Sequence, residues 1–100
     1  MWVSLDLSLG HEQNGRRPVL VLSPVRYNTL TGMFVCCPIS TRVKEYQFEV
    51  KLKAKNVFGV VQTDQIRTID WASRKITYVD TVDDETLKEV QQRVIVLITQ

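Results

Sequence analysis

Short hydrophobic runs separated by turn-forming residues fill most of the chain, and this pattern constrains the fold more than any other feature. Two of the runs, 2–7 and 47–52, alternate between apolar and polar residues, which is the period of a half-buried strand. The other runs are short and largely apolar, which is typical of buried strands: 18–23, 33–40, 57–65 and 75–79. The sequence therefore predicts five or six short strands.

Prolines and glycines refine this prediction. Pro18 fits the first position of the second strand, and Pro38 indicates that the third strand is an edge strand or carries a bulge. The segment 24–32 is expected to hold one helical turn, and Gly59 marks a bend or a close backbone approach. Residues 69–73 are expected to form a turn.

The hydrophobic period changes near the end of the chain. Asp83 is expected to cap a helix whose apolar residues recur at helical spacing: Leu87, Val90, Val94, Leu97 and Ile98. The fold class predicted is mainly β with a C-terminal α-helix, a small strongly bent, barrel-like sheet with the helix over one opening. At 100 residues the chain has room for one domain, residues 1–100.

Composition and charge narrow the classes of function. The formal net charge of +2 permits binding to a polyanion without requiring it. Lys and Arg outnumber Asp and Glu by 7 to 4 in residues 1–53 and are outnumbered by 7 to 6 in residues 54–100. No apolar run approaches the roughly 18 residues of a membrane span, and residues 1–9 do not have the pattern of a signal peptide. A cytoplasmic protein that does not bind membranes is expected.

The cysteines and the histidine argue against a metal site. Cys36 and Cys37 are adjacent, so on a strand they point to opposite faces, and neither a disulfide nor a zinc site is expected from them. His11 is the only histidine. Any catalysis is therefore expected to need no metal and no cofactor.

A polar stretch, Gly10 to Arg17, precedes the second strand and is expected to be an exposed loop. Its sequence with the following strand, GHEQNGRRPVLVLSP, resembles the signature loop of the MazF/PemK/Kid toxins. Further blocks, YNTLTGM, CCPIS, FEV and DQIRTID, match that family in order and spacing, so the resemblance covers almost the whole chain. The segments LSPVRYNTLTGM and KEYQFEV are most similar to the enteric MazF branch, which prefers short ACA-type sites, whereas the GHEQ loop is similar to that of Kid.

This resemblance implies a small SH3-like barrel, as in MazF and CcdB, and a specific activity. The family members are toxins of type II toxin–antitoxin systems that cleave single-stranded RNA at specific sequences without a metal. The ribose 2′-hydroxyl attacks the neighbouring phosphorus and leaves a cyclic phosphate and a 5′-hydroxyl, and the loss of mRNA inhibits translation and growth. The resemblance also implies a homodimer and a cognate antitoxin with a disordered acidic segment.

Such a reaction needs a base, an acid and a group that stabilises the phosphorane. Arg17 stands where the family's functional arginine falls, and a guanidinium suits a bidentate hold on phosphate oxygens; the alternative is an ordinary solvated arginine. His11 has a side chain that can exchange a proton near neutral pH, or is simply an exposed loop histidine. Glu12 is a candidate base, although orienting Arg17 is the favoured role.

Further candidates come from other blocks and from the rest of the loop. Asp64 matches an aspartate that Kid-like toxins use as a candidate base, and its alternative is a turn carboxylate that caps the following segment. The arginine of those toxins two residues earlier is Gln62 here, and an amide cannot serve as an acid. Ser40 aligns with a hydroxyl that contacts phosphate, and its alternative is a plain strand-end serine. The remaining substrate-binding candidates are Gln13, Arg16 and Gln65. For Gln13 a hydrogen bond to the loop backbone is favoured over one to substrate, and for Arg16 an ordinary surface charge is the favoured interpretation.

Aromatic side chains in loops are candidates for stacking on splayed bases: Tyr27, Tyr46 and Phe58. Each also fits the core or its rim. The rival function is a gyrase poison like CcdB, which shares the fold and does not cut RNA. Such poisons end in a tryptophan-containing tripeptide, whereas this chain ends in Leu-Ile-Thr-Gln and keeps the HEQ and RRP residues that they lack.

Overall fold

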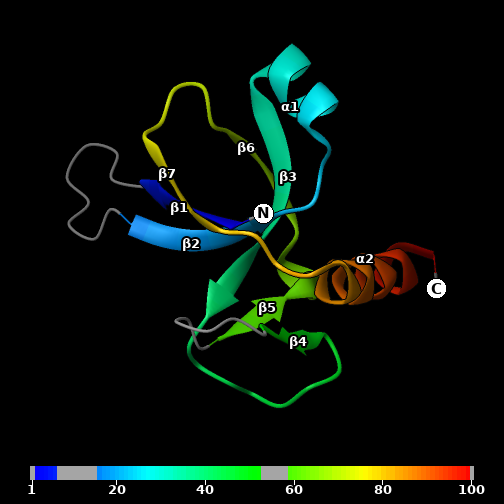
Figure 1. Cartoon of the computed structure of the whole chain (residues 1–100). Coiled ribbons are helices and arrows are strands. Elements are labelled where there is room, and N and C mark those ends of the chain that lie inside the picture. The colour runs from blue at the N-terminus through cyan, green and yellow to red at the C-terminus, as the bar shows by residue number, and fades with distance from the viewer. Residues whose placement is uncertain (1, 7–15, 53–58, 100) are drawn as a thin grey trace.

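The computed structural model describes residues 2–6, 16–52 and 59–99, with side chains from residue 18 onward except that of residue 80. The described part contains seven strands, one 3₁₀ turn and two α-helices (Figure 1). In chain order they are β1 (Trp2–Asp6), β2 (Arg16–Val21), α1 (Val25–Thr31), β3 (Met33–Ser40), β4 (Glu49–Lys51), β5 (Val60–Gln62), η1 (Thr63–Gln65), β6 (Arg67–Asp70), β7 (Ile76–Asp80) and α2 (Asp84–Thr99).

All described strand pairs are antiparallel, and the sheet is organised around β3. The strand order is β4-β5-β3-β2-β1-β7, and β6 pairs with β3 outside this path. Along one edge β3 pairs first with β6, through residues 33–36, and then with β5, through residues 39 and 40. The predicted fold class, mainly β with a C-terminal helix, is confirmed.

Two hydrophobic cores lie on the two faces of β3, because side chains alternate along a strand. The larger core contains Leu20, Cys37, Ile39, Val50, Leu52, Val61, Val82, Val90 and Val94. The smaller core contains Val19, Val21, Phe34, Cys36 and Ile69, with Trp71 packed against it. Both cysteines are free and fully buried. Adjacent cysteines therefore enter different cores, as expected for strand neighbours.

The terminal helix α2 follows the prediction except at its end. The carboxylate of Asp83 accepts the N–H of Thr86 at 3.3 Å, which is the expected N-terminal cap. Val90 and Val94 are buried in the larger core and Leu87 packs against it. Ile98, however, is 71 % exposed, so its assignment to the buried face is wrong. Among the described residues, no helix has the length and apolar character needed to cross a membrane.

Two predictions about the second strand are wrong. Arg16 and Arg17 belong to β2, where they pair with Asp6 and Leu5, and not to the exposed loop. The reason is that ladder hydrogen bonds join backbone groups, so pairing with β1 continues past the point where the side chains become polar. Pro18 is consequently the third residue of β2 and not the first.

The third strand and its surroundings also differ from expectation. Pro38 lies on an internal strand, at the point where β3 changes partner from β6 to β5, so the edge-strand prediction is wrong. The run 57–65 was expected to be a strand throughout, but its last three residues form η1. Residues 67–70 form β6, which the sequence did not predict, because only Ile69 of this strand is buried and no alternation marks it. The helical segment after Pro24 and the strand at 75–79 are confirmed as α1 and β7.

Candidate active site

The candidates from the polar loop are described only in part. His11, Glu12 and Gln13 lie outside the described residues. For Arg16 and Arg17 the structure gives the backbone position at the start of β2. In the β2–β3 ladder Val19 lies opposite Pro38. Arg17 comes two residues before Val19 along β2.

Ser40 is the last residue of β3, and it follows the same ladder pair by two residues. The register therefore brings Arg17 and Ser40 to the same end of the sheet. The Oγ atom of Ser40 accepts the N–H of Arg42 at 3.0 Å, and an accepting hydroxyl keeps its own proton for donation. A Cβ atom at Gly59 would lie 3.0 Å from the backbone oxygen of Ser40, which confirms the close approach predicted at this glycine.

Asp64 lies in η1, half-buried, beside the exposed Gln65. Its Oδ1 atom accepts a hydrogen bond from the hydroxyl of Tyr46 at 2.7 Å. This bond raises the pKa of Tyr46 to about 12, with smaller contributions from burial and from the charges of Asp64 and Glu49, because all of them disfavour the phenolate. The ring of Tyr46 meets that of Phe48 edge to face, with centroids 6.3 Å apart.

The turn that carries Tyr46 is closed by one carboxylate. Glu49 accepts the N–H groups of Lys44, at 3.0 Å, and of Glu45, at 2.8 Å. Its own N–H donates to the carbonyl of Tyr46 at 3.0 Å. Glu45 has a φ of 58°, the left-handed region, a conformation that costs a non-glycine residue energy and needs support from its surroundings. The Glu49 carboxylate supplies that support.

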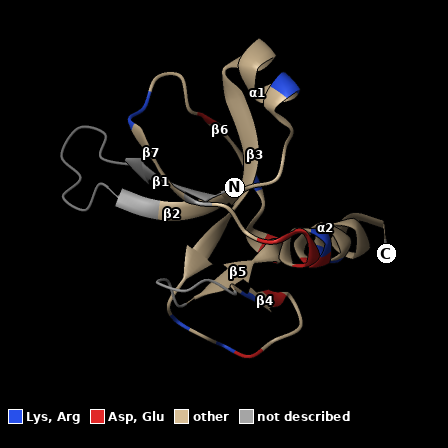
Figure 2. Ribbon diagram, viewed as in Figure 1, with Lys and Arg blue, Asp and Glu red and all other residues tan. Residues whose placement is uncertain are grey.

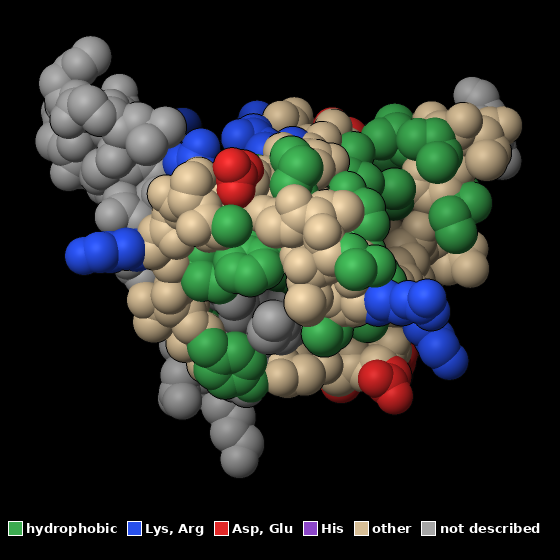
Figure 3. Space-filling model, turned by 90° about the horizontal axis from the view of Figure 1, so that it is seen from above, with side chains coloured by type: hydrophobic (Ala, Val, Ile, Leu, Met, Phe, Trp, Pro, Cys, Tyr) green, Lys and Arg blue, Asp and Glu red, His purple; other side chains and the backbone are tan. Residues whose placement is uncertain are grey.

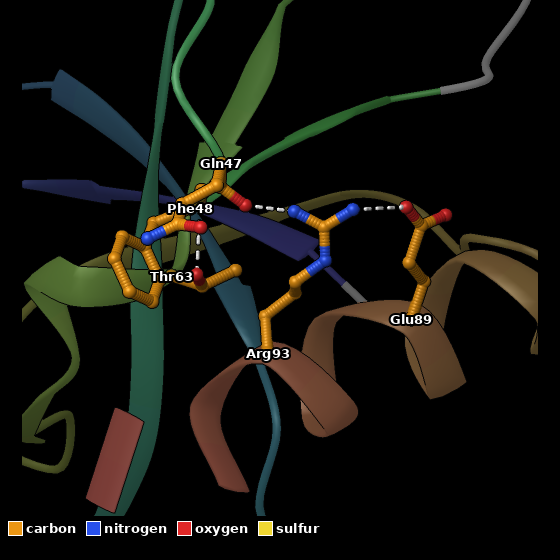
Figure 4. A network of polar contacts seen from close by, with 5 residues as sticks. All are labelled: Gln47, Phe48, Thr63, Glu89 and Arg93. Carbon is orange, nitrogen blue, oxygen red and sulfur yellow. Dashed lines mark hydrogen bonds and ion pairs between the residues drawn. The ribbon is translucent and has the colours of Figure 1, made fainter. Parts of the chain in front are cut away.

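Two further donors hold the same turn from η1 and from α2 (Figure 4). Thr63 donates both its N–H, at 2.9 Å, and its hydroxyl, at 2.7 Å, to the carbonyl of Phe48. Arg93 of α2 donates to the carbonyl of Gln47 and forms an ion pair with Glu89 at 3.2 Å. The turn before β4 is therefore tied to both elements that flank it.

Charged side chains surround this region unevenly. The segment between β3 and β4 carries two basic residues followed by an acidic one, and acidic residues gather at the start of α2 (Figure 2). Arg42 and Lys44 are exposed on this segment. No group of three or more His, Cys, Asp and Glu side chains that could hold a metal ion occurs in the part of the chain that the structure describes.

The structure therefore brings some candidates together and separates others. Asp64 meets Tyr46, a residue that the sequence marked only for base stacking. Tyr27 lies on α1, which leads into the start of β3, whereas Ser40 ends that strand (Figure 1). Phe58 lies outside the described residues.

The contact between Tyr46 and Asp64 was missed because the two residues are 18 positions apart. The β4–β5 register, with Glu49 opposite Gln62, contains the signal. If this register is continued by one pair, Phe48 lies opposite Thr63. The residues that follow on the two segments include Tyr46 and Asp64, so the register brings these two residues close together.

The comparisons with known proteins agree with this geometry. Residues 1–98 match the family model described as "PemK-like, MazF-like toxin of type II toxin-antitoxin system". The endoribonuclease toxin MazF of Escherichia coli strain K12 is 43% identical over 98 residues, which cover 98% of this chain and 88% of that protein. The Escherichia coli endoribonuclease PemK is 35% identical over 102 residues, covering 97% of this chain and 77% of the relative.

Solved structures give the same result. The crystal structure of MazF from Deinococcus radiodurans matches with a TM-score of 0.86 and 42% identity, covering 99% of this chain and 93% of that one. A MazE–MazF crystal structure from the same organism contains a chain with a TM-score of 0.86 and 40% identity, covering 97% of this chain and 89% of that one. These relatives are MazF-type toxins, so the gyrase-poison alternative is not favoured. The chain belongs to the family of PemK-like, MazF-like toxins of type II toxin–antitoxin systems.

Proposed function

We propose that this protein is the toxin of a type II toxin–antitoxin system and that it cleaves single-stranded RNA at specific sequences without a metal ion. The observation that carries the proposal is the match of residues 1–98 to the toxin family, together with relatives named as endoribonucleases. Cleavage of mRNA would stop translation and growth. The protein would act in the cytoplasm, where its substrate is.

The chemistry proposed is attack of the ribose 2′-oxygen on the adjacent phosphorus, with loss of the 5′-oxygen as a hydroxyl. Arg17 stabilises the negative charge that develops on the phosphorane, because its planar donors fit two phosphate oxygens at once. Proton transfer to and from the two ribose oxygens is shared among His11, Glu12 and Asp64. The half-buried position of Asp64 next to an exposed residue supports a role that needs both a fixed carboxylate and access to substrate.

Substrate binding is proposed for the residues around these groups. Ser40 donates its hydroxyl proton to a phosphate oxygen, which is supported by its acceptor role toward Arg42. The other contacts are assigned to Gln13, Arg16 and Gln65. The exposed side chain of Gln65 supports its share in this assignment.

The protein is proposed to work as a homodimer. A groove of about 390 Å³ between β3 and α2 is lined mainly by apolar residues, Val35, Ile66, Val94 and Ile95 among them. Further apolar side chains on α1 and α2 are exposed, and hydrophobic side chains gather over the upper face of the molecule (Figure 3). Leu30 is 76 % exposed on α1 and Ile95 is 49 % exposed on α2. A second copy would remove this surface from water.

A separate antitoxin is proposed as the partner that holds the toxin inactive. The solved MazE–MazF complexes are of homologous toxins with their antitoxins. A disordered acidic segment fits the net charge of +2 and the arginines at the start of β2. Such a segment would become ordered on binding and cover the groups proposed to bind and cleave RNA.

The test is incubation of the purified protein with a long single-stranded RNA in EDTA. Discrete fragments that end in a cyclic phosphate and begin with a 5′-hydroxyl are expected. Intact RNA together with stalled gyrase would instead establish the rival function of a gyrase poison. Mapping the fragment ends on one transcript would also give the recognition sequence.

A further inference from the structure

Three consecutive backbone carbonyls in the turn before β4 each accept a hydrogen bond from a different part of the molecule. The carbonyl of Tyr46 accepts from the N–H of Glu49, and that of Gln47 accepts from Arg93. The carbonyl of Phe48 accepts from the N–H and the hydroxyl of Thr63 (Figure 4). A surface turn does not need so many fixed points for its own stability, because water can satisfy exposed carbonyls.

These fixed points have one common consequence: they set where the side chain of Tyr46 stands. The donors come from β4, α2 and η1, so the turn cannot shift relative to η1 without breaking several bonds. The phenol ring is also held edge-on by Phe48. The hydroxyl then reaches the carboxylate of Asp64 at 2.7 Å, a short bond to a charged acceptor.

A carboxylate on a three-residue 3₁₀ turn has little local support of its own. The rotation about χ2 of an aspartate is broad, so both oxygens would sample many directions without a partner. The bond from Tyr46 engages Oδ1 and so fixes the plane of the carboxylate, which leaves Oδ2 with a defined direction. Proton transfer depends on such a direction, because the acceptor must lie within hydrogen-bond reach of the proton.

We propose that Tyr46 is a positioning residue for Asp64, and that Arg93 supports it by fixing the turn that carries it. This inference rests on the proposed function, in which Asp64 takes part in proton transfer during RNA cleavage. Tyr46 itself does not exchange a proton with RNA. Its hydroxyl orients the group that does.

The kinetic test compares Tyr46→Phe with Asp64→Asn and with the double variant, using a short RNA that contains one cleavage site. Tyr46→Phe is expected to lower kcat about tenfold, equivalent to about 1.4 kcal/mol, with little change in KM. Asp64→Asn is expected to lower kcat by about 100-fold or more, as for loss of a general base. In the Asp64→Asn background the tyrosine substitution should have no further effect, because nothing remains to be positioned.

A purely structural role of Tyr46 gives a different result. The two substitutions would then multiply in the double variant, and the free energy of unfolding of Tyr46→Phe would fall. Tyr78→Phe is the matched control, because Tyr78 also makes a 2.7 Å hydroxyl contact, to Thr81, but stands 58 % exposed on β7. It should cleave like the parent protein. Multiplicative effects, or an unchanged kcat in Tyr46→Phe, would overturn the proposal.

The support from α2 is tested with Arg93→Met. This variant should lower kcat in the parent protein about threefold, less than the tenfold change that removing the hydroxyl itself produces. It should have no effect once Tyr46 is phenylalanine. Glu89→Gln is the control, since it removes the ion pair but keeps the donor to Gln47. An equal loss in both backgrounds would contradict the role assigned to Arg93.

A spectroscopic measurement separates failure of this inference from failure of the proposed function. The bond to Asp64 is the first cause that raises the pKa of Tyr46 to about 12. In Asp64→Asn the pKa of the Tyr46 phenol should lie closer to its ordinary value. NMR of ring-labelled tyrosine between pH 9 and pH 11 can follow this titration, and a spectrum of Tyr46→Phe identifies which signal belongs to Tyr46. A protein that cuts no RNA but shows this change lacks the proposed function and keeps the contact. If the phenol of Tyr46 titrates at the same pH in the parent protein and in Asp64→Asn, the contact is absent. The positioning role is then wrong whether or not the protein cleaves RNA.

Discussion

The α1 region and the η1 region of this molecule use polar side chains in opposite ways. In the α1 region Ser23 and Asn28 bond to each other at 2.5 Å, and Ser23 accepts the N–H of Val35 at 2.9 Å. The indole N–H of Trp71 donates to the carbonyls of Asn28 and Met33, both at 3.2 Å. None of these side chains titrates. Their partners are largely backbone groups, so they close the join between α1, β3 and β6.

In the η1 region the side-chain partners carry charge. Tyr46 donates to the Asp64 carboxylate, Glu49 closes the turn, and Arg93 connects that turn to α2. Hydrogen bonds to ionised groups are shorter and stronger than bonds between neutral groups. The comparison teaches that the same small fold has one region where polar groups serve stability and one where they hold Asp64, the carboxylate proposed to take part in proton transfer. Substitutions in the two regions should therefore separate stability from activity.

The largest effect is expected from Arg17→Ala at the start of β2. Cleavage should fall about 100- to 1000-fold, or by about 3–4 kcal/mol in transition-state stabilisation, because the donor proposed to hold the phosphorane is lost. The midpoint of thermal unfolding should stay nearly unchanged. The measurement is single-turnover cleavage of a labelled RNA beside thermal unfolding. Arg26→Ala, on the exposed face of α1, is the control and should cleave normally. Persistent cleavage by Arg17→Ala would contradict the role proposed for Arg17.

The second effect compares the two cores through their thiols. Burial raises the pKa of Cys36 to about 11, against a partial lowering by Arg67. Burial, with Cys36 and Asp64 adding to it, raises the pKa of Cys37 to about 12. Both thiols are held neutral in the folded protein, so their contribution to stability is complete below pH 9 and is lost as the pH rises toward these values.

Between pH 9 and pH 11 each thiol should lower the free energy of unfolding by about 1.4 kcal/mol per pH unit. Urea unfolding under reducing conditions at pH 8, 9 and 10 measures the slope. Replacing either cysteine by alanine should remove its own share. Above pH 11 Cys36 ionises in the folded protein, and of the two thiols only Cys37 should still contribute to the slope, together with Tyr46, whose pKa is also raised to about 12. A free energy of unfolding that stays constant up to pH 10 would show that the thiols ionise at the same pH in the folded and unfolded protein, which would contradict this prediction.

A smaller effect is expected from Asn28→Ala in the α1 region. Asn28 is buried at 8 % exposure, and its amide group donates to the carbonyl of Ser23 at 3.2 Å and accepts from its hydroxyl. Its removal leaves Ser23 without these partners, which should cost about 2 kcal/mol of unfolding free energy. Chemical unfolding measures the cost, with Thr29→Ala on the exposed side of the same helix as the control. Cleavage per folded molecule should not change. A variant that folds normally and cleaves poorly would contradict the separation of the two regions.

Much of the fold follows from local patterns, because hydrophobic period and turn chemistry act over a few residues. The strands at 33–40 and 75–79, the short helix before Gly32 and the capped terminal helix are all readable in this way. The strand at 67–70 is not readable, because its residues are mostly exposed and it exists through backbone pairing with β3. The edge-strand prediction from Pro38 was wrong for a related reason, because the change of partner along β3 is set by the whole sheet and not by local sequence.

The candidate site divides in the same manner. The resemblance in the GHEQNGRRP and DQIRTID blocks marked Arg17 and Asp64 as residues that carry chemistry, and their roles remain predictions. The partner of Asp64 was not predictable from composition or spacing, because the β4–β5 register and the support from Arg93 bring Tyr46 to it. Long-range pairing decides such contacts, and it leaves no mark on either segment alone.

The smallest effect is expected from Asp83→Ala at the start of α2, and it shows which part of α2 supports the η1 region. The Asp83 carboxylate accepts the N–H of Thr86, so its loss should cost about 1 kcal/mol of unfolding free energy and fray the first turn. Arg93 lies more than two turns further along the helix, and its bond to Gln47 should remain. Cleavage is therefore expected to match that of the parent protein at a temperature where both are folded, whereas Arg93→Met loses activity. If Asp83→Ala lowered kcat as much as Arg93→Met does, the whole of α2, and not the side chain of Arg93 alone, would hold the turn before β4. The η1 region would then depend on global stability, as the α1 region does.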